Sequence, residues 1–189
     1  FYHQIKLRRA SPQDDYLTIL SNSTDGNGDN IPIDELLSII TIDLLASGNE
    51  TTTAAIASGV LILAKNQVIQ HALRNNKSLI PVFVEEVLRL ESPAQGMFRR
   101  VTSDTSLDDY QFKNGDILSL RFGAANRDRS AFLQADEVDL SRHKPGNHLA
   151  FGVGRHSCIG APLARQELIA SFETITERRN HWPPYIIFG

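Results

Sequence analysis

The feature that most constrains the fold is a long, mostly apolar segment with helical character over residues 34–65. Acidic side chains at Asp34 and Glu35 suit the start of a helix, because the unpaired N–H groups there carry partial positive charge. Polar residues crowd its middle, namely Asp43, Ser47, Asn49, Glu50, Thr51, Thr52 and Thr53. They would strongly destabilise a helix facing lipid. The sequence therefore predicts a helix buried in protein, with its polar groups facing a cavity, and no membrane span.

The composition excludes several classes of protein. A single cysteine among 189 residues excludes an internal disulfide framework and a multi-cysteine zinc site. It also suits a reducing compartment, so we expect a cytoplasmic protein. The formal net charge of −3 gives no electrostatic reason to expect nucleic acid or an anionic membrane as a partner.

Two further helices are predicted downstream. One runs over about 78–90 and ends before Ser92-Pro93, because the residue before a proline disfavours helical backbone. The other begins near Pro162 and covers about 161–178. Helices therefore dominate the predicted fold.

A minor antiparallel β-sheet is expected between these helices. The stretches 104–112 and 117–122 have strand character and flank Asn114-Gly115, a pair that tolerates the positive φ angles of a tight turn. The pattern predicts a hairpin closed at this turn. The fold class is therefore mainly α with a minor antiparallel β-sheet.

The strongest chemical signal is a glycine-rich loop over 151–160 that contains Cys158. Gly152 and Gly154 permit a tight turn that no side chain obstructs. The cysteine lies just before the helix that starts near Pro162, where the positive helix end favours a thiolate. Such a thiolate can be a nucleophile or a metal ligand, whereas most free cysteines are small buried hydrophobes. The residues alone leave these alternatives open.

The loop resembles the haem-binding loop of the cytochromes P450. The shared pattern is Phe-Gly-x-Gly-x-His-x-Cys-x-Gly over 151–160, followed by Ala-x-Leu-Ala-Arg-x-Glu over 161–167. Four further motifs agree with the family in the family's order: Ser47-Gly48-Asn49-Glu50-Thr51-Thr52, Glu86-Val87-Leu88-Arg89, Ala125-Asn126-Arg127-Asp128 and the stretch ending at Arg142. The resemblance implies a haem-thiolate monooxygenase of the soluble bacterial type.

The resemblance implies haem b as the cofactor, with the Cys158 thiolate as the axial ligand of iron. Haem carries two propionates, which need cationic or hydrogen-bonding partners. The family pattern assigns them to Arg99, His148 and His156. It also places Phe151 and Gly152 against the haem, and Gly48 where the haem and oxygen approach the backbone of the long helix.

Glu50 and Thr51 are the catalytic residues that the resemblance implies. They place a carboxylate beside a hydroxyl in the middle of the long helix. Such a hydroxyl can bond to the preceding turn and open the helix locally. In the family this pair relays protons during oxygen activation. The implied partners are O2, a small organic substrate, and an electron donor of the ferredoxin or flavodoxin type or a fused reductase.

Glu86, Arg89 and Arg142 are expected to form a structural ion network. Glu86 and Arg89 stand three residues apart and therefore share one face of a helix. By itself this spacing is typical of an exposed pair that contributes little. The resemblance implies instead a buried network with Arg142 behind the haem. The family usually has Pro and Phe where this chain has Ala135 and Val138.

The resemblance covers only the C-terminal half of the cytochrome P450 fold, so 1–189 is expected to be a partial domain. Residues 178–189 match no part of the family. The apolar surfaces of the two helices over 34–65 and 78–90 are expected to be exposed without the other half and to favour association.

Two alternatives stay open. One is a truncated, non-catalytic remnant or haem-binding module. The other is a thiol enzyme with Cys158 as the nucleophile and His156 as the base, although two residues of one tight loop rarely allow the base to be oriented by a third group.

Overall fold

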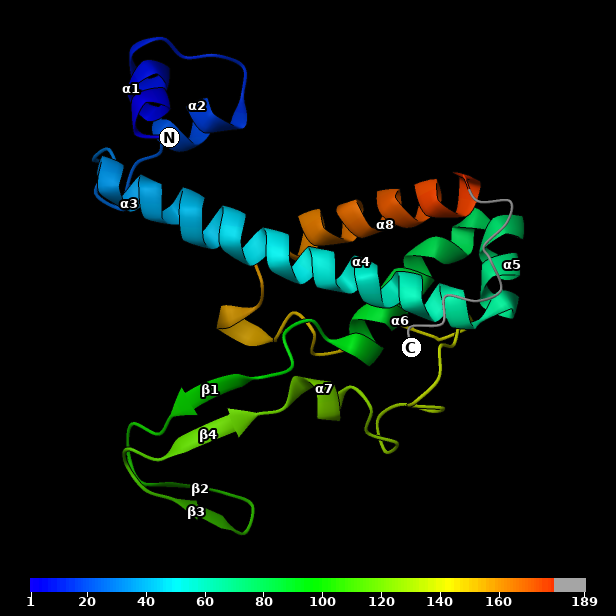
Figure 1. The fold of residues 1–189 in the computed structure, drawn as a ribbon. Coiled ribbons are helices and arrows are strands. Elements are labelled where there is room, and N and C mark those ends of the chain that lie inside the picture. Colours follow the sequence, from blue (N-terminus) through cyan, green and yellow to red (C-terminus); the bar gives the residue numbers. More distant parts are fainter. Residues whose placement is uncertain (179–189) are drawn as a thin grey trace, which may run out of the picture. The chain divides into compact units, whose positions relative to one another are not determined.

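The computed structural model describes residues 1–178 and divides them into two compact units. The first unit covers Phe1–Glu50, and the second begins at Thr51. The segment 179–189, which includes most of the stretch without a family match, lies outside the described residues. Figure 1 shows the helices and strands of both units.

The first unit contains the short helices α1 (Tyr2–Ala10), α2 (Tyr16–Ser21) and α3 (Ile33–Ser38). A carboxylate caps α2: Asp15 accepts a hydrogen bond of 2.7 Å from the backbone N–H of Thr18. The buried apolar side chains of this unit come from α1, α3 and the start of the next helix, and they are Ile5, Leu36 and Ile40. This core is small, because α1 has only 9 residues and α2 and α3 have 6 each.

The long helix predicted over 34–65 runs without a break over Ile33–Lys65. It consists of α3, a π-helical segment η1 (Ile39–Ala46) and α4 (Ser47–Lys65). The Ser47 hydroxyl donates to the carbonyl of Ile42, five residues back, at 3.0 Å. We expected the local opening of the helix at Thr51. The structure instead widens the helix before that residue, and Thr51 itself lies in regular α-helix.

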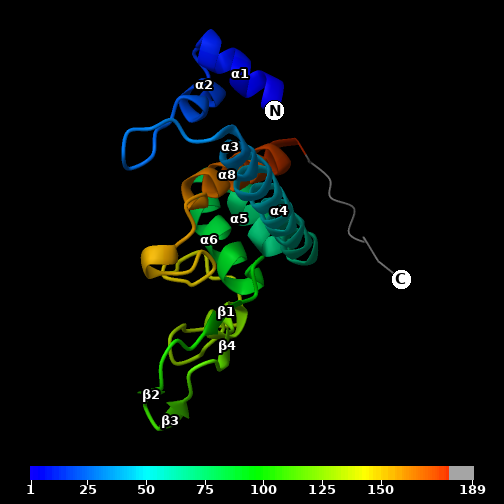
Figure 2. The ribbon, with the colours of Figure 1, turned by 90° about the vertical axis from the view of Figure 1, so that its left-hand side faces the viewer.

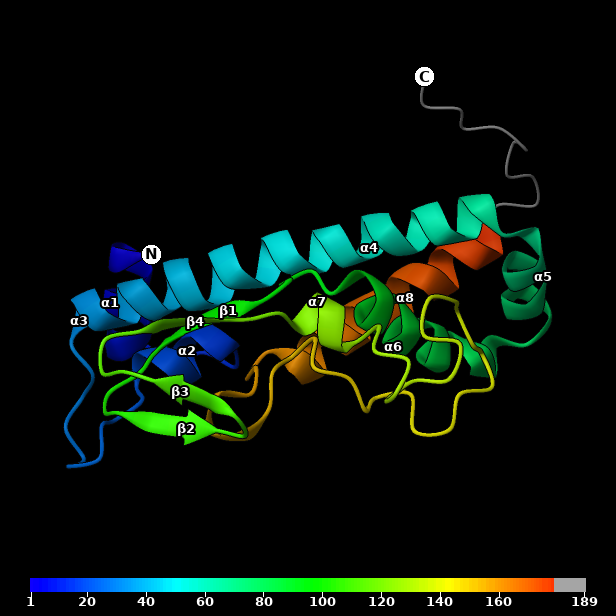
Figure 3. The same ribbon diagram turned by 90° about the horizontal axis from the view of Figure 1, so that it is seen from below.

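Four helices form the core of the second unit: α4, α5 (Gln67–Asn75), α6 (Ile80–Glu91) and α8 (Ala161–Arg178). The helix predicted over 78–90 is α6 with the single 3₁₀ turn η2 (Lys77–Leu79) before it, and α5 was not predicted. The views of Figures 2 and 3 both place α8 along α4. At the centre, the rings of Phe83 and Phe172 meet edge to face with their centroids 5.1 Å apart.

The strands pair differently from the predicted hairpin. The two sheets each have two antiparallel strands: β1 (Met97–Arg100) pairs with β4 (Ile117–Leu120), and β2 (Thr105–Leu107) with β3 (Tyr110–Phe112). The stretch 104–112 thus folds on itself instead of pairing with 117–122. Gly115 has the expected positive φ of 97°, but its N–H donates to the carbonyl of Val101. The turn therefore returns the chain to β1.

Within residues 1–178, no single helix is long and apolar enough to cross a membrane. The pair Ile33–Lys65 and Gln67–Asn75 passes the test of length and composition only when both helices are taken together, and these are bent by 106° relative to each other.

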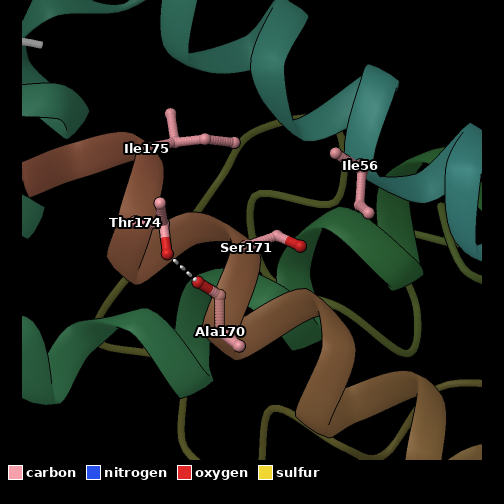
Figure 4. A pocket seen from close by; sticks show the side chains of 5 residues that line it. All are labelled: Ile56, Ala170, Ser171, Thr174 and Ile175. Carbon is pink, nitrogen blue, oxygen red and sulfur yellow. Dashed lines mark hydrogen bonds between the residues drawn. The ribbon is translucent and has the colours of Figure 1, made fainter. Parts of the chain in front are cut away.

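A shallow groove of about 430 Å³ lies between α4 and α8. Its lining residues are Ile56, Ala170, Ser171, Thr174 and Ile175, as Figure 4 shows. The Thr174 hydroxyl donates to the carbonyl of Ala170 at 2.8 Å and is therefore satisfied within its own helix. None of the predicted site residues lines this groove.

Candidate functional site around Cys158

The loop over 151–160 closes back on its own first residue. Gly152 and Gly154 have φ angles of 66° and 79°, in the left-handed region that favours glycine. The backbone N–H of Cys158 donates to the carbonyl of Phe151 at 2.8 Å. The Cys158 side chain is exposed, and its neighbour Ile159 is 97% exposed. The turn therefore presents the thiol at the surface of the described chain.

The loop leads directly into α8, a helix of 18 residues. The N–H of Ala161 lies 3.4 Å from the carbonyl oxygen of Cys158, and Ala164 donates to Gly160 at 2.9 Å. Cys158 thus precedes the first helical residue by three positions. The pKa of Arg165 is raised, chiefly by its hydrogen bond to Glu85 and further by the negative charge of that carboxylate.

The predicted ion network is assembled on one buried carboxylate. Glu86 accepts from Arg89 at 2.8 and 3.0 Å and from Arg142 at 2.7 and 3.2 Å. The side chains of Glu86 and Arg89 are fully buried, and that of Arg142 is 8% exposed. Both guanidinium groups also lie over the ring of Phe132. Burial raises the pKa of Glu86, but the bonds from Arg89 and Arg142 outweigh it, so the net pKa shift is downward.

The network also fixes the irregular segment between β4 and the cysteine loop. Arg89 donates to the carbonyl oxygens of Asn126, Ala135 and Glu137 at 2.6–2.9 Å. The N–H of Asp139 donates to Glu86 at 2.9 Å. Ala135 and Val138, where the family usually has Pro and Phe, therefore leave the network intact. The network uses the backbone carbonyl of Ala135 and not its side chain.

His148, which was expected to bind a propionate, makes hydrogen bonds within the chain through both ring nitrogens. Its Nδ1 accepts the N–H of Ala150 at 3.2 Å, and its Nε2 lies 3.0 Å from Oε2 of Glu85. Its side chain is 1% exposed. Because Nδ1 accepts, Nε2 carries the proton and donates it to the carboxylate. In the described chain His148 therefore binds Glu85.

The sequence interpretation missed two residues of this cluster, Glu85 and Arg165. Arg165 donates to both carboxylate oxygens of Glu85, at 2.6 and 3.0 Å. Glu85 could have been found from the sequence, because it is a second acidic residue beside Glu86 in a largely apolar helical segment. Arg165 itself lies in the Ala-x-Leu-Ala-Arg motif after the loop.

Arg99 and His156 are exposed, as a contact with a bound anionic group requires. Arg99 lies on β1, where its side chain donates to the carbonyl of Phe98 at 2.9 Å. His156 lies in the 3₁₀ turn η3 (Gly154–His156) of the cysteine loop itself.

The predicted catalytic pair lies on a different element, α4. Glu50 and Thr51 are consecutive, exposed residues of the first turns of this helix. A Cβ added at Gly48 would meet no atom within 4 Å, so this face of the helix is open in the described chain.

The comparisons with known proteins agree on one family. The family model described as cytochrome P450 matches residues 2–179. The chain is 39% identical over 175 residues to cytochrome P450 107B1 of Saccharopolyspora erythraea, covering 92% of this chain and 42% of that protein. It is 36% identical over 174 residues to the steroid C26-monooxygenase of Mycobacterium tuberculosis, covering 92% of this chain and 46% of that protein.

A solved structure gives the same result. The crystal structure of CYP109E1 from Bacillus megaterium in complex with corticosterone has a TM-score of 0.88 and 34% identity, covering 97% of this chain and 49% of that one. The chain thus spans less than half the length of these relatives.

Proposed function

Since the chain belongs to the cytochrome P450 family, we propose that it is part of a haem-thiolate monooxygenase in which Cys158 ligates the iron. The observation that carries the proposal is the exposed thiol of Cys158, presented by a glycine turn immediately before α8. A thiolate is a soft ligand that suits iron in this setting.

The residues around Cys158 fit a haem. Gly152 and Gly154 leave the turn without side chains that would obstruct a flat ligand, and Ile159, the residue after Cys158, adds an exposed apolar side chain. Arg99 and His156 are the exposed candidates for the propionates, whereas His148 is already bound to Glu85. When bound, a haem with a thiolate ligand supplies the activation of O2 for inserting one oxygen atom into an organic substrate.

The remaining site residues transfer protons or leave room for a ligand. The Glu50 carboxylate holds a proton, and the adjacent Thr51 hydroxyl passes it on. Gly48 has no side chain, so a ligand can approach the helix backbone there. Exposure of all three residues supports these assignments.

The proposed partners follow from the same chemistry. The reaction needs O2, a small organic substrate and electrons from a redox protein of the ferredoxin or flavodoxin type or a fused reductase. A lone cysteine suits a reducing compartment, so we place the protein in the cytoplasm.

The test is carbon monoxide spectroscopy on the protein produced from its complete gene. We expect the reduced, haem-loaded protein to give the strongly red-shifted Soret band of a thiolate-ligated haem. Replacement of Cys158 by alanine should abolish this band, whereas Ser157→Ala, next to it in the same loop, should keep it. Absence of haem uptake by the wild type would overturn the proposal and favour a non-catalytic remnant, and thiol-dependent hydrolysis without haem would favour a cysteine nucleophile.

A further inference from the structure

One carboxylate connects the two sides of the cysteine loop. Glu85 of α6 binds His148, three residues before the loop over 151–160, with Nε2 and Oε2 3.0 Å apart. It also binds Arg165, near the start of α8, through two hydrogen bonds of 2.6 and 3.0 Å. The chain between these two anchors carries Cys158.

These contacts are tightly packed. The side chains of Glu85 and His148 are 12% and 1% exposed. At Gly146, an added Cβ would lie 3.3 Å from Oε2 of Glu85, so the backbone before His148 passes close to the carboxylate. Hydrogen bonds between a buried carboxylate and its donors are the strong ones in proteins.

We call the group of Glu85, His148 and Arg165 the clamp. It is connected to the cysteine through Phe151. The guanidinium group of Arg165 lies 4.6 Å from the centroid of the Phe151 ring, and the ring of His148 lies 6.1 Å from it. The carbonyl of Phe151 accepts the N–H of Cys158. The ring that packs on the clamp thus belongs to the residue that holds the cysteine backbone.

The loop itself makes few contacts with the rest of the described chain, and the segment before it is also held by the hydrogen bond of 2.7 Å from the N–H of Leu149 to Oδ1 of Asn126 and by the buried side chain of Ala150. Residues 153–159 are all exposed, so their packing against the rest of the described chain contributes little. Its internal hydrogen bonds fix its shape but not its attachment to α6. The position of Cys158 is therefore set by the two ends of the loop.

We propose that Glu85 is a positioning residue for Cys158, because it fixes the segment before the loop and the helix after it to α6. This role rests on the proposed function of Cys158 as the haem ligand. The adjacent Glu86 binds a different segment, through the N–H of Asp139 and the side chain of Arg142. The two carboxylates therefore attach different segments of the chain to α6.

Amide hydrogen exchange tests the clamp without haem. In the protein produced from its complete gene, Glu85→Gln should accelerate exchange in segment 149–160 by about tenfold or more, since it removes charge-assisted hydrogen bonds. Glu86→Gln is the matched control: beyond the general acceleration that its lower global stability causes, it should accelerate exchange in segment 127–142 and not in segment 149–160. If Glu85→Gln does not fold, Arg165→Gln takes its place and should accelerate exchange in the same segment. Unchanged exchange in 149–160 would overturn the proposal.

The carbon monoxide spectrum gives a second readout, which a purely structural role would not alter. At equal haem content, Glu85→Gln should lower the share of the red-shifted thiolate band, and Glu86→Gln at a matched folded fraction should not. An equal share in both variants would overturn the proposal. A wild-type protein without the thiolate band would refute the proposed function instead, and the exchange experiment would still decide whether the clamp exists.

Discussion

Glu85 and Glu86 show how two neighbouring carboxylates of one helix can have separate partners. Glu86 is fully buried and binds two arginines, whereas Glu85 binds one arginine and one histidine. Burial raises the pKa of Glu85, but the bonds from His148 and Arg165 outweigh it and lower the pKa to about 2. Both groups are thus ionised in the folded protein at neutral pH.

The low pKa of Glu85 predicts a defined pH dependence of stability. Its ordinary pKa is 4.5, so its contribution to folding is complete above that pH and is lost as the pH falls from 4.5 towards 2. We expect the free energy of unfolding of Glu85→Gln to lie below that of the wild type by a constant amount at neutral pH. The difference should shrink in acid. Urea unfolding between pH 2.5 and 7 measures it, and a difference independent of pH would contradict the assignment.

Removal of one partner of the Glu86 network should have a larger effect. Glu86→Gln leaves Arg89 buried without its counter-ion, which costs about 3–5 kcal/mol in the free energy of unfolding. Arg129→Gln is the control, because Arg129 is 85% exposed and pairs with a half-exposed aspartate. It should change stability by less than about 1 kcal/mol. Equal effects of the two substitutions in urea unfolding would show that the buried network does not stabilise the fold.

The contact between α4 and α8 depends on a glycine. A Cβ added at Gly59 would lie 2.2 Å from Cζ of Phe172, whose ring is fully buried and packs against Phe83. The absence of a side chain therefore sets how closely the two helices approach. The same helix has a second glycine, Gly48, where an added Cβ would meet nothing within 4 Å.

These two glycines predict opposite responses to alanine. Gly59→Ala should destabilise the protein by about 1–3 kcal/mol, because the extra methyl group overpacks the core. Gly48→Ala should stabilise it by up to about 1 kcal/mol, because alanine is the better helix former. Phe172→Leu combined with Gly59→Ala should recover part of the loss. Thermal unfolding of the variants provides the measurement, and a neutral Gly59→Ala would show that the helices can move apart freely.

At the scale of the whole molecule, large apolar side chains remain exposed on the helices. On the long helix these are Ile42, Leu44, Leu45 and Leu61, with exposed fractions of 39–58%, and on α5 Val68 is 80% exposed. The apolar cores of the two units are separate clusters. Exposed apolar surface of this kind favours association.

Residues 1–189 expressed alone should therefore be marginally stable or self-associate. We expect a broad thermal transition and an apparent mass in sedimentation that rises with concentration. Replacement of Leu61 and Val68 by lysine should reduce the association, whereas lysine at the hairpin residue Leu107 should not. A monomer with a sharp, cooperative transition would contradict this prediction.

The sequence by itself determined the features that depend on local order. The acidic pair Asp34 and Glu35, Pro93 and Pro162 indicated three helices close to their observed bounds. The motif around Cys158 predicted a turn whose glycines do adopt positive φ angles. Such features arise within a few residues, so neighbouring positions carry the information.

Only the tertiary structure decided the partners of distant groups. Strand pairing was predicted wrongly, because several short strands of similar character could pair with the same neighbour. In the structure the N–H of Gly115 donates to the carbonyl of Val101, next to β1, so the strand after the turn pairs with β1. His148 was assigned to a propionate, but its ring binds Glu85, 63 residues earlier in the chain. A buried donor binds the acceptor that the packing of the chain brings to it, and that choice is not contained in its own segment.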